Sequence, residues 1–311
     1  MFDCRKPLIL FLFCVSMNIA LANAATENSF DMAKIEKLTG RKGTFDKKEN
    51  VFKVSMPRKD LRIAVGETTM TPPMGLTAWA AFTKAGDSTM VMGDMPLLED
   101  QVNPVMSVVL DNGLEVTALH NHFLWDSPKV MFMHVGGMGD ESKLADAVGK
   151  VFAEIEKTAT IRSDVRKIKL EPSQTSLDPN KIDQVFGVKG QLSDGVYRIT
   201  FGRTTKMDGY EVGNAMGVNT WAAFVGSDEL AVVDGDFALY EQEVQTVLKT
   251  LRGGGINIVA VHNHMIMEQP RVIFLHFWGL GKTTDLAKGL KAAIDTQKET
   301  AEGPTKAMKA M

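Results

Sequence analysis

The sequence predicts an α+β protein made of two homologous domains, each a mostly antiparallel sheet with its helices on one face. The second half of the chain repeats the first, because Trp79 and the residues around it recur at Trp221, 142 positions later, and the register holds from Gly75 onward. In each copy, short segments of alternating apolar and polar residues are interrupted by segments with helical periodicity. Two copies of this length are domains rather than solenoid units, which are shorter and more numerous.

Each copy is expected to follow the order strand, strand, helix, strand, strand, helix. In the first copy these elements are expected at residues 79–82, 89–93, 98–110, 115–123 and 129–135, with a last helix ending near Lys157. This order predicts antiparallel layers with the helices packed on one face of the sheet. A duplicated unit often reproduces an ancestral isologous contact, so we expect the copies to be related by a pseudo-twofold axis.

The ends and the middle of the chain differ in composition from the repeats. We expect a signal peptide over residues 1–24, a first domain over 25–159, a linker over 160–177, a second domain over 178–299 and a flexible tail over 300–311. Arg5 and Lys6 precede an apolar run and a small-residue cleavage site that ends at Ala24, as in secretory signals. A periplasmic or secreted location is therefore expected, with no stable membrane insertion after cleavage.

Cysteine use and charge exclude several kinds of protein. Cys4 and Cys14 both lie in the expected signal peptide, so the mature chain is expected to hold no disulfide and no thiolate ligand. The chain has 35 Lys and Arg against 38 Asp and Glu, a formal net charge of −3. This balance offers neither a nucleic-acid stripe nor a polybasic membrane patch. The expected partner is a small molecule or an envelope glycan, and the expected state is a monomer with two pseudo-symmetric domains.

All histidines of the chain lie in the repeats, with the same spacing in each copy. They are His120, His122 and His134, then His262, His264 and His276. Residues two apart on a strand share a face, so the first two of each trio are expected to point the same way. The third lies on the next strand of the predicted hairpin. If paired residue numbers add to an even value, about 252 or 254, it shares that face, whereas an odd sum turns it away.

Three neutral imidazoles around an open coordination position form a catalytic zinc arrangement, and imidazole also suits copper, iron and nickel. A divalent metal, with zinc favoured, is therefore one interpretation of each trio. A metal-free polar or acid–base pocket and satisfied structural histidines are the alternatives that the sequence leaves open.

Carboxylates near the histidines are candidate fourth ligands or proton carriers. They are Asp94 and Glu99, with their counterparts Asp236 and Glu241. Each has a simpler interpretation, because Asp94 follows a glycine and could shape a turn, and Glu99 could stabilise the start of a helix.

The segments at residues 98–106, 111–122 and 127–134, which include Ala-Leu-His-Asn-His, resemble the bacterial LppY/LpqO family, a domain of unknown function. The second copy is similar to the same family at residues 261–265, 269–278 and 286–295. Named members are described as lipoproteins, which implies an envelope location. This chain departs from them because Cys14 follows Phe11-Leu12-Phe13 and makes a poor lipid acceptor. The family often has a further histidine where this chain has Gly136 and Met138, and it implies no agreed activity.

Two functions of different classes fit these observations. One is an exported cell-envelope protein whose duplicated histidine clusters bind a divalent metal and which, if catalytic, is a metal-dependent hydrolase. The other is a non-enzymatic module that binds peptidoglycan or another envelope glycan, with histidines and tryptophans lining its groove. A purely structural role for the histidines is the third interpretation.

Overall fold

The computed structural model describes residues 30–159 and 168–302, with the backbone alone for residues 298–302. The predicted signal peptide, residues 160–167 of the predicted linker and residues 303–311 of the predicted tail lie outside the described residues. Among the described helices, none combines the length and the apolar character that a membrane span requires.

One large sheet contains strands from both repeats. The first repeat contributes β1 (Gly43–Asp46), β2 (Val51–Pro57), β5 (Thr77–Ala85), β6 (Ser88–Leu98), β7 (Glu115–His120) and β9 (Val130–Gly139). The second contributes β10 (Gln191–Ser193), β11 (Val196–Gly202), β14 (Asn219–Gly226), β15 (Ala231–Tyr240), β16 (Asn257–His262) and β17 (Val272–Gly281). The order is β1-β2-β5-β6-β9-β7-β16-β17-β15-β14-β11-β10, and every pairing is antiparallel.

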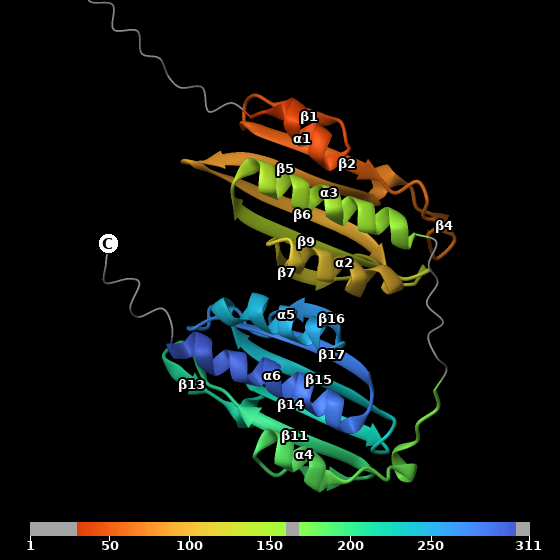
Figure 1. Ribbon diagram of the computed structural model, residues 1–311, viewed down its shortest axis with the longest axis vertical. Coiled ribbons are helices and arrows are strands. Elements are labelled where there is room, and N and C mark those ends of the chain that lie inside the picture. The colour runs from red at the N-terminus through yellow and green to blue at the C-terminus, as the bar shows by residue number, and fades with distance from the viewer. Residues whose placement is uncertain (1–29, 160–167, 303–311) are drawn as a thin grey trace, which may run out of the picture. The chain divides into compact units, whose positions relative to one another are not determined.

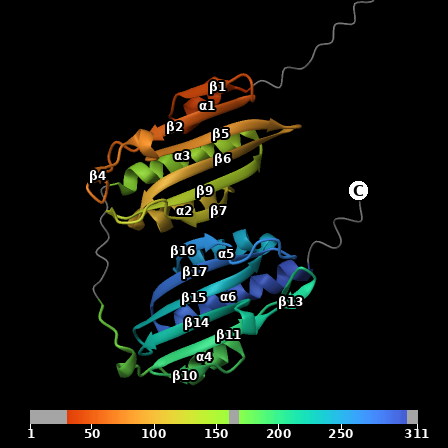
Figure 2. The ribbon, with the colours of Figure 1, turned by 180° about the vertical axis from the view of Figure 1, so that it is seen from behind.

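The helices of each repeat cover one face of its strands (Figure 1). They are α1 (Met32–Thr39), α2 (Glu99–Asp111) and α3 (Glu141–Thr158), then α4 (Pro179–Phe186), α5 (Val244–Gly253) and α6 (Thr283–Glu302). Seen from behind, the strands lie in front of these helices (Figure 2). The expected fold class, two homologous α+β units with helices on one face, is confirmed. α6 continues to Glu302, so its last turn extends into the expected tail.

The main core lies between the strands and the helices. On β5, Ala78, Ala80 and Phe82 are fully buried, whereas the residues between them are partly exposed. α3 buries Val148 and Val151 along its apolar face. This alternation leaves every second residue of a strand on the face away from the helices, which we call the open face.

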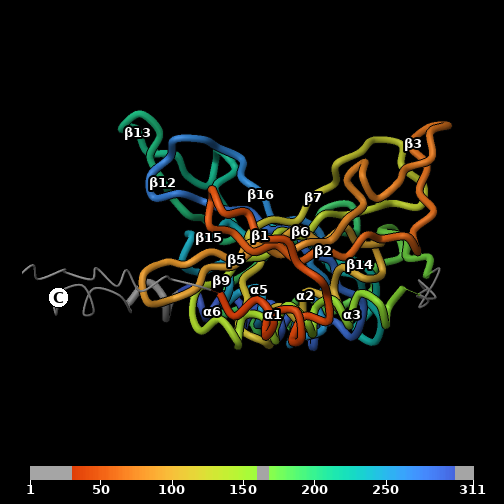
Figure 3. The backbone as a smooth tube through the Cα atoms, turned by 90° about the horizontal axis from the view of Figure 1, so that it is seen from above, coloured from red at the N-terminus to blue at the C-terminus, as the bar shows by residue number. Residues whose placement is uncertain are grey.

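Two short β elements lie on the open side of the sheet (Figure 3). β3 (Ala64–Val65), β4 (Thr68–Thr69) and β8 (Asp126–Ser127) form one, and β12 (Thr205–Met207) and β13 (Tyr210–Val212) form the other. Each stands beside a small apolar cluster, one around Phe132 and one around Phe274. The chain thus has a minor core on the open face in each repeat, in addition to the main core.

The two repeats meet through equivalent residues. Leu119 of β7 pairs with Val261 of β16, which is its own counterpart 142 positions later. An antiparallel pair of equivalent residues places a local twofold axis between them, as the repeat predicted. The amide of Asn103 exchanges hydrogen bonds of 3.2 and 2.8 Å with the backbone of Ile258. Gln245, the counterpart of Asn103, makes the same pair of bonds to Val116, at 3.0 and 2.9 Å.

Candidate metal centre

The β7–β9 hairpin has the even register. His120 pairs with Phe132 and Ala118 pairs with His134, so paired numbers add to 252. His134 is therefore diagonal to His120 on the open face. A bulge at Thr117 shifts the pairing only beyond this point, between Val116 and Ala118. The second repeat has the same register, with His262 opposite Phe274 and Ala260 opposite His276.

The middle histidine of each trio is not on a strand, and that part of the prediction is wrong. β7 ends at His120 and β16 ends at His262, so His122 and His264 lie in the loops that follow. Asn121 donates a hydrogen bond of 2.9 Å to the carbonyl of Phe123, and Asn263 makes the same bond to Met265 at 2.7 Å. These local bonds turn the loop back over the sheet and return the middle histidine to the open face.

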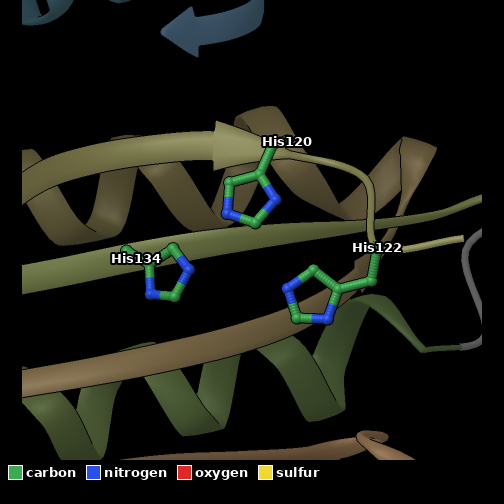
Figure 4. A group of neighbouring side chains, drawn as sticks. All are labelled: His120, His122 and His134. Atoms are coloured by element: carbon green, nitrogen blue, oxygen red, sulfur yellow. The ribbon is translucent and has the colours of Figure 1, made fainter.

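The three imidazoles of each repeat face a common space, as Figure 4 shows for the first trio. One ligand nitrogen from each ring lies within 4.8 Å of those of the other two. Nε2 of His264 is 3.0 Å from Nε2 of His262. Nitrogens bound to one tetrahedral zinc ion at about 2.0–2.1 Å are about 3.3 Å apart, so the rings need only small rotations to share an ion.

A backbone carbonyl lies near Nδ1 of one ring in each trio. Nδ1 of His120 lies 3.3 Å from the carbonyl of Asn121, and Nδ1 of His276 lies 3.4 Å from that of Gly235. A neutral imidazole that donates from Nδ1 keeps Nε2 as an acceptor, which is the usual second interaction of a metal-ligating histidine.

An aspartate stands beside each trio. Asp94 pairs directly with His134 across β6 and β9, and Asp236 pairs with His276 across β15 and β17. The carboxylate of Asp236 has Oδ1 3.8 Å from Nδ1 of His276 and Oδ2 3.9 Å from Nε2 of His264. Both aspartates lie within a strand, so the alternative that Asp94 shapes a turn is wrong.

The glycine before each aspartate is explained by packing instead of by a turn. A Cβ at Gly93 would lie 2.7 Å from the carbonyl oxygen of Trp79, and at Gly235 it would lie 2.2 Å from that of Trp221. No side chain fits at either glycine unless the backbone of the neighbouring strand, β5 or β14, moves.

The two glutamates occupy other places. Glu99 is the first residue of α2 and is exposed, five residues beyond Asp94 on the chain, or about 16 Å at the rise of a strand. Glu241 lies in the turn before α5, with its Oε1 3.7 Å from Nε of Arg271. The structure therefore brings Asp94 and Asp236 to the histidines, and it leaves Glu99 and Glu241 at the starts of helices.

A family of proteins described as Domain of Unknown Function (DUF1259) matches the chain at residues 33–154 and again at 180–296. The chain belongs to this family. It carries two tandem DUF1259 repeats, and each match contains one complete histidine trio. No curated protein matches the chain. A solved structure titled as a trimeric bacterial microcompartment shell protein, PduB, shares 8% identity with a TM-score of 0.22, covering 83% of this chain and 91% of that chain. A likeness of that degree carries no argument.

A phenylalanine that the sequence analysis missed supports each DUF1259 trio. The ring of His122 stacks on Phe132 with centroids 3.4 Å apart and planes at 3°, and His264 stacks on Phe274 at 3.5 Å and 9°. Both phenylalanines are buried in the minor cores. The available signal was an apolar residue two positions before the third histidine in both copies, hence on the same face of the strand.

Three tryptophans that could stack on a sugar differ in their surroundings. Trp79 and Trp221 each have a cation over the ring, Lys53 Nζ at 4.0 Å and Arg198 Cζ at 4.2 Å from the centroid. Trp125 is 82% exposed at the tip of the loop that follows His122.

Burial of the site shifts its titrating groups. Burial raises the pKa of Asp94, against the opposing effect of the histidines, and it raises the pKa of Asp236 to about 6. Burial and the nearby rings lower the pKa of His262 to about 4, and burial lowers the pKa of His122 and of His264. Near neutral pH these three imidazoles are therefore uncharged, which is the form that binds metals.

Two atoms of these sites are buried without a hydrogen-bond partner. They are Oδ1 of Asp94 and Nδ1 of His262. Such atoms are rare in folded proteins, and a metal ion is a common partner for a carboxylate oxygen such as Oδ1 of Asp94. A set of imidazole nitrogens with one carboxylate oxygen suits Zn²⁺ and other divalent first-row metals. The residues present therefore fit a metal.

Proposed function

We propose that each DUF1259 repeat binds one divalent transition-metal ion, with zinc favoured. His120, His122 and His134 would hold the first ion, and the second trio would hold the other. Asp94 and Asp236 would act as fourth ligands or would orient the third histidine. The observation that carries the proposal is that all six histidines lie in two trios, each of which converges on a point beside an aspartate of the neighbouring strand.

Elemental analysis of the purified full-length protein tests this proposal. We expect two ions per chain, which chelator removes and which zinc, copper or nickel restores in a calorimetric titration. A dialysed protein without bound metal, and without affinity for any of these three ions, would refute it.

A catalytic role extends the proposal. A divalent ion in such a site supplies Lewis-acid polarisation of a carbonyl or phosphoryl oxygen, and hydrolysis of an ester, amide or phosphate is the reaction class we propose. Asp94 and Asp236 are the carboxylates within reach to move a proton, whereas Glu99 and Glu241 are not. Turnover of model esters and phosphates that stops on chelation would support hydrolysis, and metal-loaded protein without any turnover would leave a binding role alone.

We further propose that the chain acts in the cell envelope after export and corresponds to the LppY/LpqO family. The support is its N-terminal sequence, with Arg5 and Lys6 before an apolar run and a cleavage site at Ala24. N-terminal sequencing of protein from a periplasmic or culture fraction is the test, and we expect it to begin at Ala25. An intact N-terminus in the cytosolic fraction would contradict export.

Glycan binding is the second candidate, and Trp125 is the observation that favours it. Its ring is 82% exposed in the loop that follows His122, available to stack on a sugar. Trp79 and Trp221 give less support, because a cation already occupies one face of each ring. Retention on purified cell-wall material that chelator does not affect, and that Trp125→Ala abolishes, would favour this function.

A further inference from the structure

The two histidine trios are neighbours across the local twofold axis. Leu119 pairs with Val261 and both are buried. Because faces alternate along a strand, the next residues, His120 and His262, both point to the open face. Residues diagonal to each other in such a ladder have Cβ atoms about 7–8 Å apart. A ligand of modest size can therefore contact both trios.

A cavity of about 450 Å³ lies at this place. The first repeat lines it with Thr117, Ala118 and His120, and the second lines it with His262 and with the loop that carries Ile266 and Met267. Its volume is in the range of small-molecule sites. The lining is unequal, because most of it, including the loop, comes from the second repeat, although each trio contributes one histidine, His120 and His262.

The wall of the cavity combines apolar side chains with one cation. Met265, Ile266, Met267 and Ile273 supply the apolar part, and Arg271 supplies the charge. Ile266 and Met267 are 75% and 84% exposed, so this loop offers apolar surface that the fold itself does not cover.

Arg271 differs from its counterpart in the first repeat. Lys129 is bound to the buried carboxylate of Asp126 at 2.8 Å. The matching carboxylate, Glu268, is 4% exposed, and its Oε2 has no hydrogen-bond partner. Arg271 lies instead at the cavity, 3.7 Å from the exposed Glu241, a contact of little energetic weight. The cation of the second repeat is thus left available for an anion from outside the chain.

We propose that this cavity binds a small amphiphilic anion, a carboxylate or phosphate monoester with an apolar chain. The anionic group lies between Arg271 and the second histidine trio, and the chain lies against Ile266 and Met267. The proposal rests on the proposed metal at that trio, which supplies the second positive charge. The two repeats then differ in role, because the second supplies Arg271, His262 and the apolar loop, whereas the first supplies His120 with Thr117 and Ala118.

The test uses the full-length protein after its metal content has been measured. Calorimetry compares octanoate and octyl phosphate with acetate, which lacks the chain, and with octyl glucoside, which lacks the charge. We expect the two amphiphilic anions to bind and the two controls not to bind. The relative affinity of octanoate and octyl phosphate distinguishes a carboxylate ligand from a phosphate ligand.

Matched variants locate the binding. Thr117→Trp fills the cavity from the first repeat, whereas Val259→Trp places the same side chain at the equivalent exposed position of the second repeat, outside the cavity lining. Arg271→Gln removes the cation, and Glu241→Gln alters only its exposed partner. We expect Arg271→Gln to weaken binding by about tenfold or more, because a hydrogen bond to a charged group is lost. We expect Thr117→Trp to weaken binding by about tenfold or more as well, because the indole occupies the space of the ligand. Val259→Trp and Glu241→Gln should bind within about twofold of the wild type.

Three results would overturn the proposal. They are an equal loss of affinity in Thr117→Trp and Val259→Trp, binding of octyl glucoside as tight as that of the anions, and no binding of the anions by protein that carries two ions. Failure of the metal proposal is seen separately, because the ions are counted before any ligand is added. All four variants leave the histidines and aspartates unchanged, so each is expected to keep two ions.

Discussion

Asp236 and His276 face each other across β15 and β17, with the carboxylate Oδ1 3.8 Å from the imidazole Nδ1. Asp94 and His134 hold the same cross-strand relationship in the first repeat. Because the pairing is direct and mid-strand, the backbone fixes the aspartate beside the third histidine in both copies. The carboxylate is therefore part of each histidine site.

Asp236→Asn is expected to lower the metal affinity of the second site by about 10–100-fold, the usual effect of removing a carboxylate that ligates a metal or orients its histidine. Asn keeps the size of the side chain, so the strand pairing should persist. Competition titration against a chromophoric chelator measures the effect. Asp94→Asn should weaken the first site in the same way, and unchanged affinities in both variants would show that the carboxylates act only in the fold.

Metal stoichiometry separates the two trios. His276→Ala should reduce the content from two ions per chain to one, and the double variant with His134→Ala should hold none, because two imidazoles retain a divalent ion weakly. Elemental analysis after gel filtration reads this directly. Glu99→Gln and Glu241→Gln are the controls and should keep two ions, since these side chains lie at helix starts. Loss of an ion from either control would show that the glutamate is a metal ligand, which would contradict the proposed ligand set.

The metal-free protein should show two opposed pH dependences. Burial raises the pKa of Asp236 to about 6 from 3.8, so its contribution to stability is present below pH 3.8 and lost as the pH rises through 6. Burial lowers the pKa of His262 to about 4 from 6.5, so its contribution is present above pH 6.5 and lost as the pH falls through 4. Over most of this range the two groups offset each other.

Substitution should reveal each dependence. Relative to the wild type, the Tm of chelated His262→Gln should rise as the pH is lowered from 6.5 to 4, because this variant lacks the loss of stability that comes from protonating His262. The Tm of chelated Asp236→Asn should fall over the same interval. Differential scanning calorimetry at matched ionic strength provides the measurement, and two curves parallel to the wild type would exclude these shifts.

Much of the architecture could be predicted because local signals agree with it. The repeat offset gave both copies, and the glycines at Gly40 and Gly187 end α1 and α4 with φ of 66° and 74°. The spacing of the histidines left an even or an odd sum of paired residue numbers open, and the structure has an even sum, 252. The parity had to be learned from the structure, because a loop of the length between β7 and β9 permits either sum.

The features that could not be predicted depend on tertiary contacts. β7 stops at His120 because Asn121 bonds to the loop rather than to a strand, and alternation alone does not reveal that end. The stacking of His122 on Phe132 requires the minor core beneath it, which is built from residues 61–76 and the hairpin. The buried Gln101 accepts a hydrogen bond from Arg58 and donates one to the carbonyl of Ile155. The helical periodicity of the sequence around Gln101 does not indicate these partners.

Glu243 and Glu241, two residues apart at the start of α5, should differ widely in their effect on stability. The carboxylate of Glu243 is fully buried and binds Arg203 through two bonds of 2.8 and 2.9 Å, whereas Glu241 is exposed. Glu243→Ala leaves the largely buried guanidinium of Arg203 without its partner, which costs about 3–5 kcal/mol of unfolding free energy. Glu241→Ala breaks a solvent-exposed pair and should cost about 0–1 kcal/mol. Urea unfolding of both variants measures the difference, and equal midpoints would show that the buried pair contributes no more than a surface contact.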